Sequence, residues 1–166
     1  MYTRLTCLLL CCCLLSSCQN SPDLDPEKER GPDSPQGSRD LTRGDHITLM
    51  KPLSFAKLQS HTLLQFGRVI MWHDLRPYEI SCIIDNDRLG PHTIQPQRYR
   101  VSKVTFNEEM YSDASATIRY YHEFKLKSDD QQPGLLLTCQ ELGGTMEYHD
   151  FPVHKIEQAT GDYFAF

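Results

Sequence analysis

The stretch ATIRYYHEFKLKS, residues 116–128, decides the fold class of this chain. Along its whole length, an apolar or aromatic phase alternates with a charged or polar phase. The first phase holds Ala116, Ile118, Tyr120, His122, Phe124 and Leu126, and the second holds Thr117, Arg119, Tyr121, Glu123, Lys125 and Lys127. A period of two over this length predicts a β-strand with one face on a core and the other in water.

The residues that follow predict a hairpin. SDDQQPG, residues 128–134, is rich in turn formers, and residues 135–141 alternate again, with Cys139 in their apolar phase. Residues 78–84 alternate in the same way and place Cys82 in their apolar phase. The two cysteines should therefore point at one core, where a bridge between them is geometrically allowed.

Other segments extend the predicted sheet. Residues 47–50 indicate a short edge strand, residues 62–72 a central strand that is apolar in both phases, and residues 163–166 a last strand. Residues 98–107 change phase between Val101 and Val104, which predicts a bulge or bend. Before the last strand, Asp150 resembles the cap of a short helix, and Gly161 would end that helix.

Together these segments predict a mainly β domain over residues 46–166, an antiparallel β-sandwich or small barrel with one short C-terminal helix. A chain of this size is normal for a single domain with one core. A barrel that crosses a membrane needs a continuous apolar outer face. The strand at 116–128 instead exposes Arg119, Glu123, Lys125 and Lys127, which argues against that fold.

Residues 1–17 have the layout of a secretory signal peptide. The first four residues carry one positive charge, residues 5–15 are apolar, and Ser16 and Ser17 are small. As a helix the apolar run would span roughly 16 Å, well short of a hydrocarbon core of ~30 Å. We therefore expect a cleaved export signal rather than a membrane-spanning helix.

Leu15-Ser16-Ser17-Cys18 resembles the lipobox of bacterial lipoproteins. The resemblance covers the signal alone and identifies no family for residues 46–166. It implies that Cys18 begins the mature chain and carries a thioether-linked diacylglycerol and an acylated amino group; two or more acyl chains hold a protein stably on a membrane. By the family's sorting rule, Gln19 after the cysteine favours the outer membrane over the inner membrane of the cell envelope.

The lipobox resemblance also accounts for most of the cysteines. Four of the seven leave with the signal, and Cys18 carries the lipid. Cys82 and Cys139 remain, and an even pair in an exported domain predicts a disulfide.

Residues 18–45 predict a disordered tether behind the lipidated cysteine. The stretch is rich in proline, glycine and charge, and it holds no aromatic residue. It cannot bury enough apolar area to offset the entropy of ordering. As a flexible coil it would have a mean span of about 30 Å.

The charge of the chain bears on its partners. The net charge is −5 with neutral histidines, and loss of the signal, whose one charged side chain is Arg4, makes it −6. Phosphate binding needs clustered positive charge. The sequence therefore predicts no nucleic-acid partner, and it argues against docking on anionic lipid through a basic face.

The sequence carries no motif for catalysis, a cofactor or a metal. It has no GxSxG elbow, no phosphate-binding glycine loop and no HExxH. His149 and His154 are spaced for neither one helix face nor one strand face, and His122 is expected in the core. Residues 85–90 begin like a calcium loop but lack its later ligands, so a turn is expected there. We expect no catalytic residue, no cofactor and no metal.

The predicted binding surface comprises Arg98, Arg100, Arg119 and Tyr121. Exposed arginine beside aromatic side chains is typical of protein-contact hot spots and suits sugar stacking, although ordinary cross-strand packing explains the same residues. The leading hypothesis is a lipid-anchored, non-enzymatic binding or structural protein of the cell envelope with a protein or glycan partner.

Two alternatives remain open. An envelope hydrolase could act on peptidoglycan or another glycan through acids such as Glu108, Glu109, Asp85 or Asp87. An accessory subunit of an envelope assembly would show an exposed apolar patch or a free sheet edge.

Overall fold

The computed structural model describes residues 39–166 apart from 58, 113–115, 130–132 and 148. The predicted signal peptide, Cys18 and most of the predicted tether lie outside the described residues. Within them, no helix combines the length and apolar character needed to cross a membrane.

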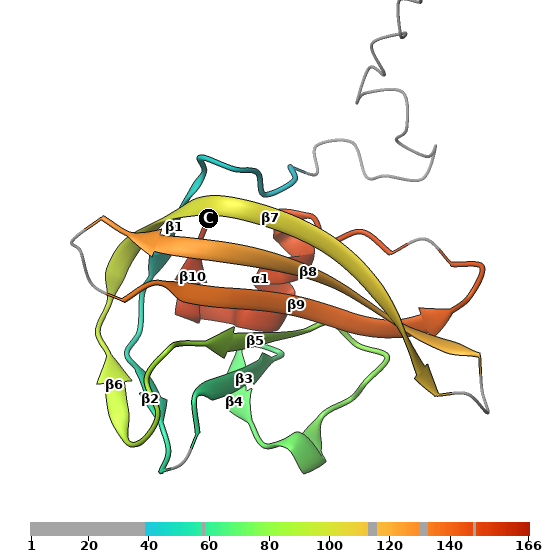
Figure 1. Cartoon of the computed structure of the whole chain (residues 1–166), viewed down its shortest axis with the longest axis horizontal. Coiled ribbons are helices and arrows are strands. Elements are labelled where there is room, and N and C mark those ends of the chain that lie inside the picture. The colour runs from blue at the N-terminus through green and yellow to red at the C-terminus, as the bar shows by residue number, and fades with distance from the viewer. Residues whose placement is uncertain (1–38, 58, 113–115, 130–132, 148) are drawn as a thin grey trace, which may run out of the picture. The chain divides into compact units, whose positions relative to one another are not determined.

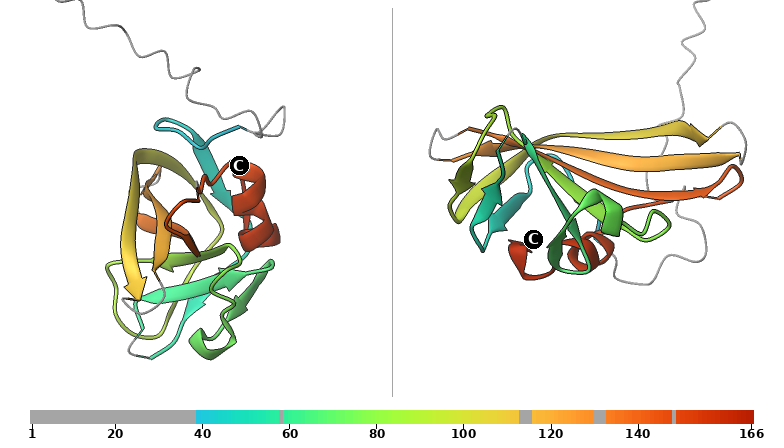
Figure 2. Two further views of the ribbon diagram at one scale, coloured as in Figure 1. Left: turned by 90° about the vertical axis from the view of Figure 1, so that its right-hand side faces the viewer. Right: turned by 90° about the horizontal axis from the view of Figure 1, so that it is seen from below.

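Eight antiparallel strands form the main sheet, in the order β10-β1-β7-β8-β9-β5-β3-β4, and β2 and β6 form a small second sheet. The strands are β1 (His46–Leu49), β2 (Leu53–Phe55), β3 (His61–Gln65), β4 (Arg68–Ile70), β5 (Ser81–Asp85), β6 (His92–Ile94), β7 (Gln97–Ser112), β8 (Thr117–Ser128), β9 (Leu135–Gly144) and β10 (Phe164–Ala165). The main sheet curls into a half-barrel (Figures 1 and 2). The predicted mainly β, antiparallel fold with one short C-terminal helix is confirmed.

The strand predicted at 116–128 is β8, which lies between β7 and β9 and pairs with both. Its side chains alternate as predicted in the second half of the strand, where Phe124 and Leu126 are buried and Lys125 and Lys127 are exposed. At its start the alternation differs: Ala116 lies in the turn before β8, and Thr117 of the predicted wet phase is buried. We call the face of β7–β9 that carries Phe124 and Leu126 the inner face, and the opposite face the outer face. The hairpin with the strand after SDDQQPG is confirmed.

The bulge predicted in residues 98–107 is present in β7. The register against β8 shifts between Val101, which lies opposite Leu126, and Lys103, which lies opposite Lys125. The extra residue, Ser102, lets Val101 and Val104 both contact the core although they are three positions apart.

The prediction of one central strand at 62–72 is wrong. These residues form the β3–β4 hairpin, and β4 lies at the edge of the sheet. The chain reverses at Phe66 (φ 52°) and Gly67 (φ 72°), and two successive positive φ angles are typical of a tight hairpin turn. Gly67 also lies against Gly161, where an added Cβ would approach the Gly67 Cα to 2.5 Å.

The C-terminal helix α1 (Val153–Thr160) lies on the concave side of the sheet, in contact with β3, β5 and β10 (Figure 1). It buries Ile156, Ala159 and Thr160 and ends at Gly161, as predicted. The predicted cap is wrong: Pro152 precedes the first turn, and no side chain caps it. A short 3-10 turn, η2 (Gly161–Tyr163), then leads into β10.

The folded part of the chain includes residues that sequence analysis assigned to the tether. Leu41 is buried in the core. Gly44 N–H donates to the Val101 carbonyl at 2.9 Å, and Val153 N–H donates to the Arg39 carbonyl at 2.9 Å. Residues 39–45 therefore pack on the domain, ahead of the predicted boundary at 46, because one buried leucine and these backbone bonds order a polar stretch.

The predicted disulfide between Cys82 and Cys139 is confirmed. The two residues face each other in the register of β5 and β9, and their sulfur atoms are bonded at 2.10 Å. Both side chains are fully buried. The bridge joins strands that are 57 residues apart in the sequence, across the centre of the sheet.

Breaking this bridge should destabilise the domain strongly. Closing a loop that joins residues 57 apart restricts the unfolded chain, and reduction should lower the free energy of unfolding by about 4 kcal/mol. Urea unfolding of oxidised protein, reduced protein and the Cys82→Ala/Cys139→Ala variant measures this free energy. The reduced protein keeps both cysteine side chains, so it separates loss of the bridge from the change in packing that alanine causes. Equal unfolding midpoints before and after reduction would contradict the prediction.

Candidate functional site

The predicted binding residues share the outer face of β7 and β8 but occupy its two ends. Arg98 and Arg100 lie near the start of β7. Arg119 and Tyr121 lie near the start of β8, which is antiparallel to β7. Arg100 pairs with Lys127, and the eight residues from there to Arg119 span about 27 Å of strand. The predicted surface is therefore two separate sites.

The Arg119 end borders a cleft, which we call the aromatic cleft. Its volume is about 400 Å³. Trp72 and Tyr111 are its exposed aromatic side chains, with 50% and 60% of their surface accessible. The lining residues are Trp72, Leu75, Pro77, Glu109, Tyr111, Arg119, Gln140, Glu141 and Leu142.

Arg119 is held in place by three neighbours. Its Nη1 donates to Glu109 Oε1 at 2.7 Å, and its Nε donates to Gln140 Oε1 at 2.5 Å. Its guanidinium lies 4.4 Å from the centre of the Tyr121 ring. A guanidinium fixed in this way loses little further entropy when a ligand binds, so the cleft presents a preorganised cation.

The Trp72 wall of the cleft is also fixed. Trp72 begins the short 3-10 turn η1 (Trp72–Asp74), and its Nε1 donates to His61 Nε2 at 3.1 Å. Behind it, the buried amide of Gln65 donates to the Arg76 carbonyl at 2.9 Å and accepts from the Arg76 N–H at 3.0 Å. Leu142 N–H donates to the Pro77 carbonyl at 2.8 Å, which ties the loop to β9.

Exposed apolar side chains continue from the cleft onto the edge of the sheet. Val69 on β4, Met71, Trp72 and Tyr78 are each about half exposed or more. In the part of the chain that the structure describes, β4 pairs with β3 alone, so its other edge is free. Val69 and Met71 were not predicted at a surface, because residues 62–72 are apolar in both phases and resemble a buried central strand.

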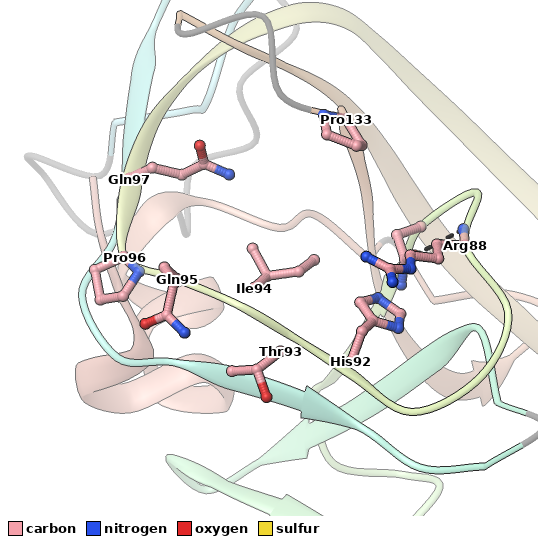
Figure 3. A pocket seen from close by; sticks show the side chains of 9 residues that line it. Arg88, His92, Thr93, Ile94, Gln95, Pro96, Gln97 and Pro133 are labelled. Atoms are coloured by element: carbon pink, nitrogen blue, oxygen red, sulfur yellow. Dashed lines mark hydrogen bonds between the residues drawn. The ribbon is translucent and has the colours of Figure 1, made fainter.

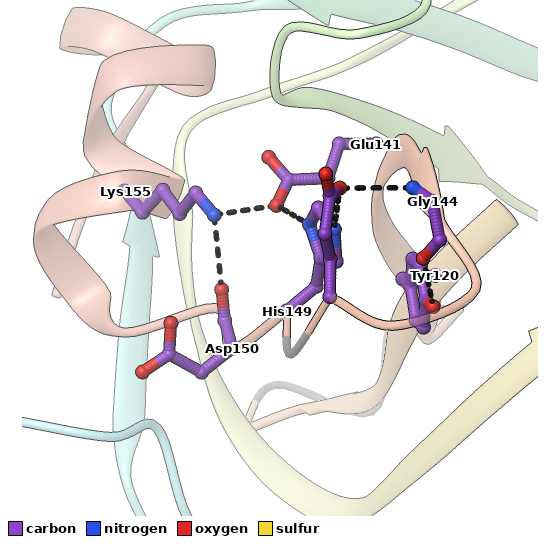
Figure 4. A network of polar contacts seen from close by, with 7 residues as sticks. Tyr120, Glu141, Gly144, His149, Asp150 and Lys155 are labelled. Carbon is purple, nitrogen blue, oxygen red and sulfur yellow. Dashed lines mark hydrogen bonds and ion pairs between the residues drawn. The ribbon is translucent and has the colours of Figure 1, made fainter. Parts of the chain in front are cut away.

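Glu141 lines the cleft but its carboxylate belongs to a structural network (Figure 4). Glu141 Oε1 accepts from His149 Nδ1 at 2.5 Å and from Lys155 Nζ at 2.5 Å. His149 stacks on Tyr120, with ring centres 4.3 Å apart. The Gly144 N–H, at 2.8 Å from Glu147, and the contact of Glu147 with His149 lower the pKa of Glu147. This network fastens the start of α1 to β9.

The acids considered for a hydrolase do not converge. Glu109 is bound to Arg119 on the outer face, and Glu108 lies opposite Tyr120 on the inner face. Asp85 and Asp87 line a different groove with Lys125 and Lys127. Burial raises the pKa of Asp85, but no second acid of this set lies in the aromatic cleft with Glu109.

A second cavity, of about 410 Å³, lies beside β6 and the residues that lead from it into β7 (Figure 3). Arg88 and His92 line one side of it, and Gln97 lines the other. His92 Nδ1 donates to the Gly90 carbonyl at 2.7 Å, and its ring stacks on Phe55. Its Nε2 has no hydrogen-bond partner among the described residues. The residues around it are mostly amides and prolines, which gives this cavity no distinct chemistry.

The histidines do not assemble a metal site in the described residues, where no group of three or more histidine, cysteine, aspartate or glutamate side chains has a suitable arrangement. His122 lies on the inner face among Phe106, Phe124 and Phe151, with ring centres 4.9 to 6.0 Å away. Burial lowers the pKa of His122, partly opposed by the charges of Asp40 and Asp150. The sequence predicts His122 in the core, but it is part-buried at the edge of the core and packs against these aromatic rings.

Comparison with known proteins adds no relative. No family model, no curated protein and no solved structure matches the chain. The geometry of its own residues is therefore the basis for a functional proposal.

His122 should make stability depend on pH. Its pKa in the folded chain is lowered, so below about pH 6.5 the unfolded chain binds a proton that the folded chain does not. The stabilising effect of a neutral His122 is complete above that pH and is lost as the pH falls. His122→Phe should therefore flatten the decline in the free energy of unfolding between about pH 7.5 and pH 5, measured by urea unfolding.

The exposed His73, with 78% of its side-chain surface accessible, supplies the control. His73→Gln should leave the decline as it is in the parent chain. An unchanged decline in His122→Phe would contradict the prediction.

Proposed function

We propose that this chain is a lipid-anchored, non-enzymatic binding protein of the bacterial cell envelope that holds an envelope protein at the aromatic cleft. The observation that carries the proposal is the fixed Arg119 guanidinium in a cleft that the exposed rings of Trp72 and Tyr111 also line. Tryptophan, tyrosine and arginine are the residues that dominate binding energy at protein contacts.

A protein partner fits the surroundings of the cleft. Val69, Met71 and Tyr78 extend the contact area beyond the cleft with apolar and aromatic surface. Methionine and aromatic side chains are enriched at such interfaces. The edge of β4 that no described strand pairs with adds backbone groups with which an extended segment of a partner could pair.

The lipid anchor is the second part of the proposal. It is supported by the lipobox resemblance of Leu15-Ser16-Ser17-Cys18. A buried disulfide is consistent with an exported domain, because disulfides persist in oxidising compartments. In this proposal the acyl chains on Cys18 hold the protein at the envelope, with the outer membrane favoured.

Binding at the cleft should depend on its aromatic and arginine side chains. A photo-crosslinking residue in place of Tyr111 should capture one macromolecule in intact envelopes, and Trp72→Ala or Arg119→Ala should weaken the purified complex by at least about 30-fold, the scale of a hot spot. The matched control places the same crosslinking residue at Phe106, which lies on the same strand as Tyr111 but on the inner face and is 49% exposed.

The products distinguish the proposals. A protein adduct at position 111 and none at position 106 supports the proposed function. An adduct that contains carbohydrate would mean that the partner at the cleft is a glycan and not a protein. Equal adducts at both positions, or none at 111, would refute binding at the cleft.

The anchor predicts a specific mature terminus. Mass spectrometry should find residue 18 as the first residue, with the mass of an acylated, diacylglyceryl-modified cysteine, and Cys18→Ser should release the protein from membranes on cell fractionation. An unmodified residue 18, or a chain that retains Met1, would remove the anchor from the proposal.

A further inference from the structure

We propose that the outer face of β7 and β8, at the end away from the aromatic cleft, docks the domain on an anionic phospholipid surface. The site consists of exposed cations, which we call the basic strip: Arg98, Arg100 and Lys103 on β7, and Lys125 and Lys127 on β8. The inference rests on the proposed lipid anchor in one respect, since the anchor supplies the membrane.

The register of the two strands concentrates the charge. Arg100 lies directly opposite Lys127, and Lys103 lies directly opposite Lys125. Side chains in such positions are neighbours on one face of the sheet, and like charges there destabilise the fold. Two such pairs lie side by side here, and an anionic surface would reduce the repulsion within them.

The bulge in β7 is what places these cations together. Arg100 and Lys103 are three positions apart, and a regular strand would direct them to opposite faces. The extra residue at Ser102 resets the alternation, so both pair with outer-face lysines of β8. Ser102 Oγ donates to the Lys125 carbonyl at 2.8 Å and thereby ties the bulge to the neighbouring strand.

The strip is not neutralised within the described part of the chain, where none of its five side chains forms an ion pair. Carboxylates nevertheless lie beside it. Asp129, just past the end of β8, follows Lys127 in the outer phase and lies next to Arg98, whose carbonyl accepts from the Asp129 N–H at 3.5 Å. Asp45 is engaged by Arg39 and Thr42. Glu123 follows on β8, and Asp85 is separated from Lys125 by Leu136 of β9 in the sheet register.

Asp87 lines the far side of the groove that Lys125 and Lys127 border. These acids and Asp129 flank the strip, but none of them forms an ion pair with its five cations among the described residues. A chain with a net charge of −5 thus carries a local positive surface.

The charge of the strip favours an anionic surface as the partner, and the segment ahead of β1 runs beside it. His46 pairs with Arg100, and the Asp45 carbonyl accepts from the Val101 N–H at 2.8 Å. The segment that leads into β1 therefore runs next to these cations, after the described chain has first packed against the start of α1 at Arg39. The rest of the molecule is acidic, which disfavours a long polyanion that would contact several faces.

The expected affinity is modest and suits an anchored protein. Each cation near an anionic bilayer strengthens binding by about fivefold. Together the five cations would strengthen binding by about a few thousandfold, which gives only weak binding for a protein that is free in solution. A short flexible tether raises the effective concentration at the membrane to the mM range, so weak binding is enough.

Vesicle binding by the chain from residue 18, with Cys18→Ser, tests the strip without any contribution from lipid. This chain retains every described core residue, since the core begins at Leu41. It should bind vesicles of phosphatidylglycerol mixed with phosphatidylethanolamine, release at high salt, and ignore vesicles of phosphatidylcholine. Lys103→Gln/Lys125→Gln/Lys127→Gln should weaken binding by roughly a hundredfold.

The control removes the same charge elsewhere. Lys57, Arg68 and Arg76 are exposed and lie outside the strip, and their replacement by glutamine should change binding by less than about threefold. Equal loss in both triple variants, or no loss in the strip variant, would overturn the proposal. Binding to duplex DNA without binding to vesicles would assign the strip to nucleic acid instead.

The outcome is separable from that of the proposed function. If the strip variant binds vesicles as the parent chain does, the proposal for the strip fails. The crosslinking result at position 111 and the mass of the mature terminus would still stand. An unacylated terminus with intact vesicle binding would retain the strip as a membrane-binding surface and remove the anchor alone.

Discussion

The alternation of side chains along β8, between two hydrogen-bonded neighbours, is the constraint on which the rest of the molecule depends. Because β8 pairs with β7 and β9 along most of its length, its inner side chains must meet the core, and its outer side chains must form a surface. The inner set packs with the Cys82–Cys139 bridge and with α1. A slip of one residue would exchange the two sets.

The outer face carries two kinds of chemistry because its two ends have different neighbours. At one end the β4–β5 loop, fixed by Gln65, brings Trp72 up to Arg119 and closes a cleft. At the other end no such loop covers the described strands, and the bulge at Ser102 aligns cations across β7 and β8. A weak contact of the basic strip with a membrane would leave the aromatic cleft, about 20 Å from the nearest cation of the strip along the strand, free for a partner.

Several features of the fold were predictable because they depend on local sequence. The hairpin after residue 128, the bulge after Val101 and the end of α1 at Gly161 each follow from a change of phase or a glycine. The hairpin turn at Phe66 and Gly67 was missed because apolar residues in both phases resemble a buried strand, and Gly67 was the one signal against it. The packing of Leu41 was missed because a single leucine in a polar stretch gives no periodicity.

The candidate surfaces were predictable only in part. Arg98, Arg100, Arg119 and Tyr121 could be assigned to wet strand faces, but their division into two sites required the pairing of β7 with β8. Net charge argued against a basic surface, since a sum over the chain contains no information on where the charges lie. Trp72 and Tyr111 come from segments far apart in the sequence, and only the fixed loop brings them to one cleft.

The sequence by itself determined the β-strand at 116–128, the inward direction of both paired cysteines and the resemblance of its first residues to a lipoprotein signal. Those properties depend on the order of residues within a few positions. The tertiary structure alone decided that Arg100 faces Lys127, that Arg119 lies between Glu109 and Gln140, and that β4 is an edge. These are contacts between distant segments, and their geometry is fixed by strand register and core packing, which no local pattern specifies.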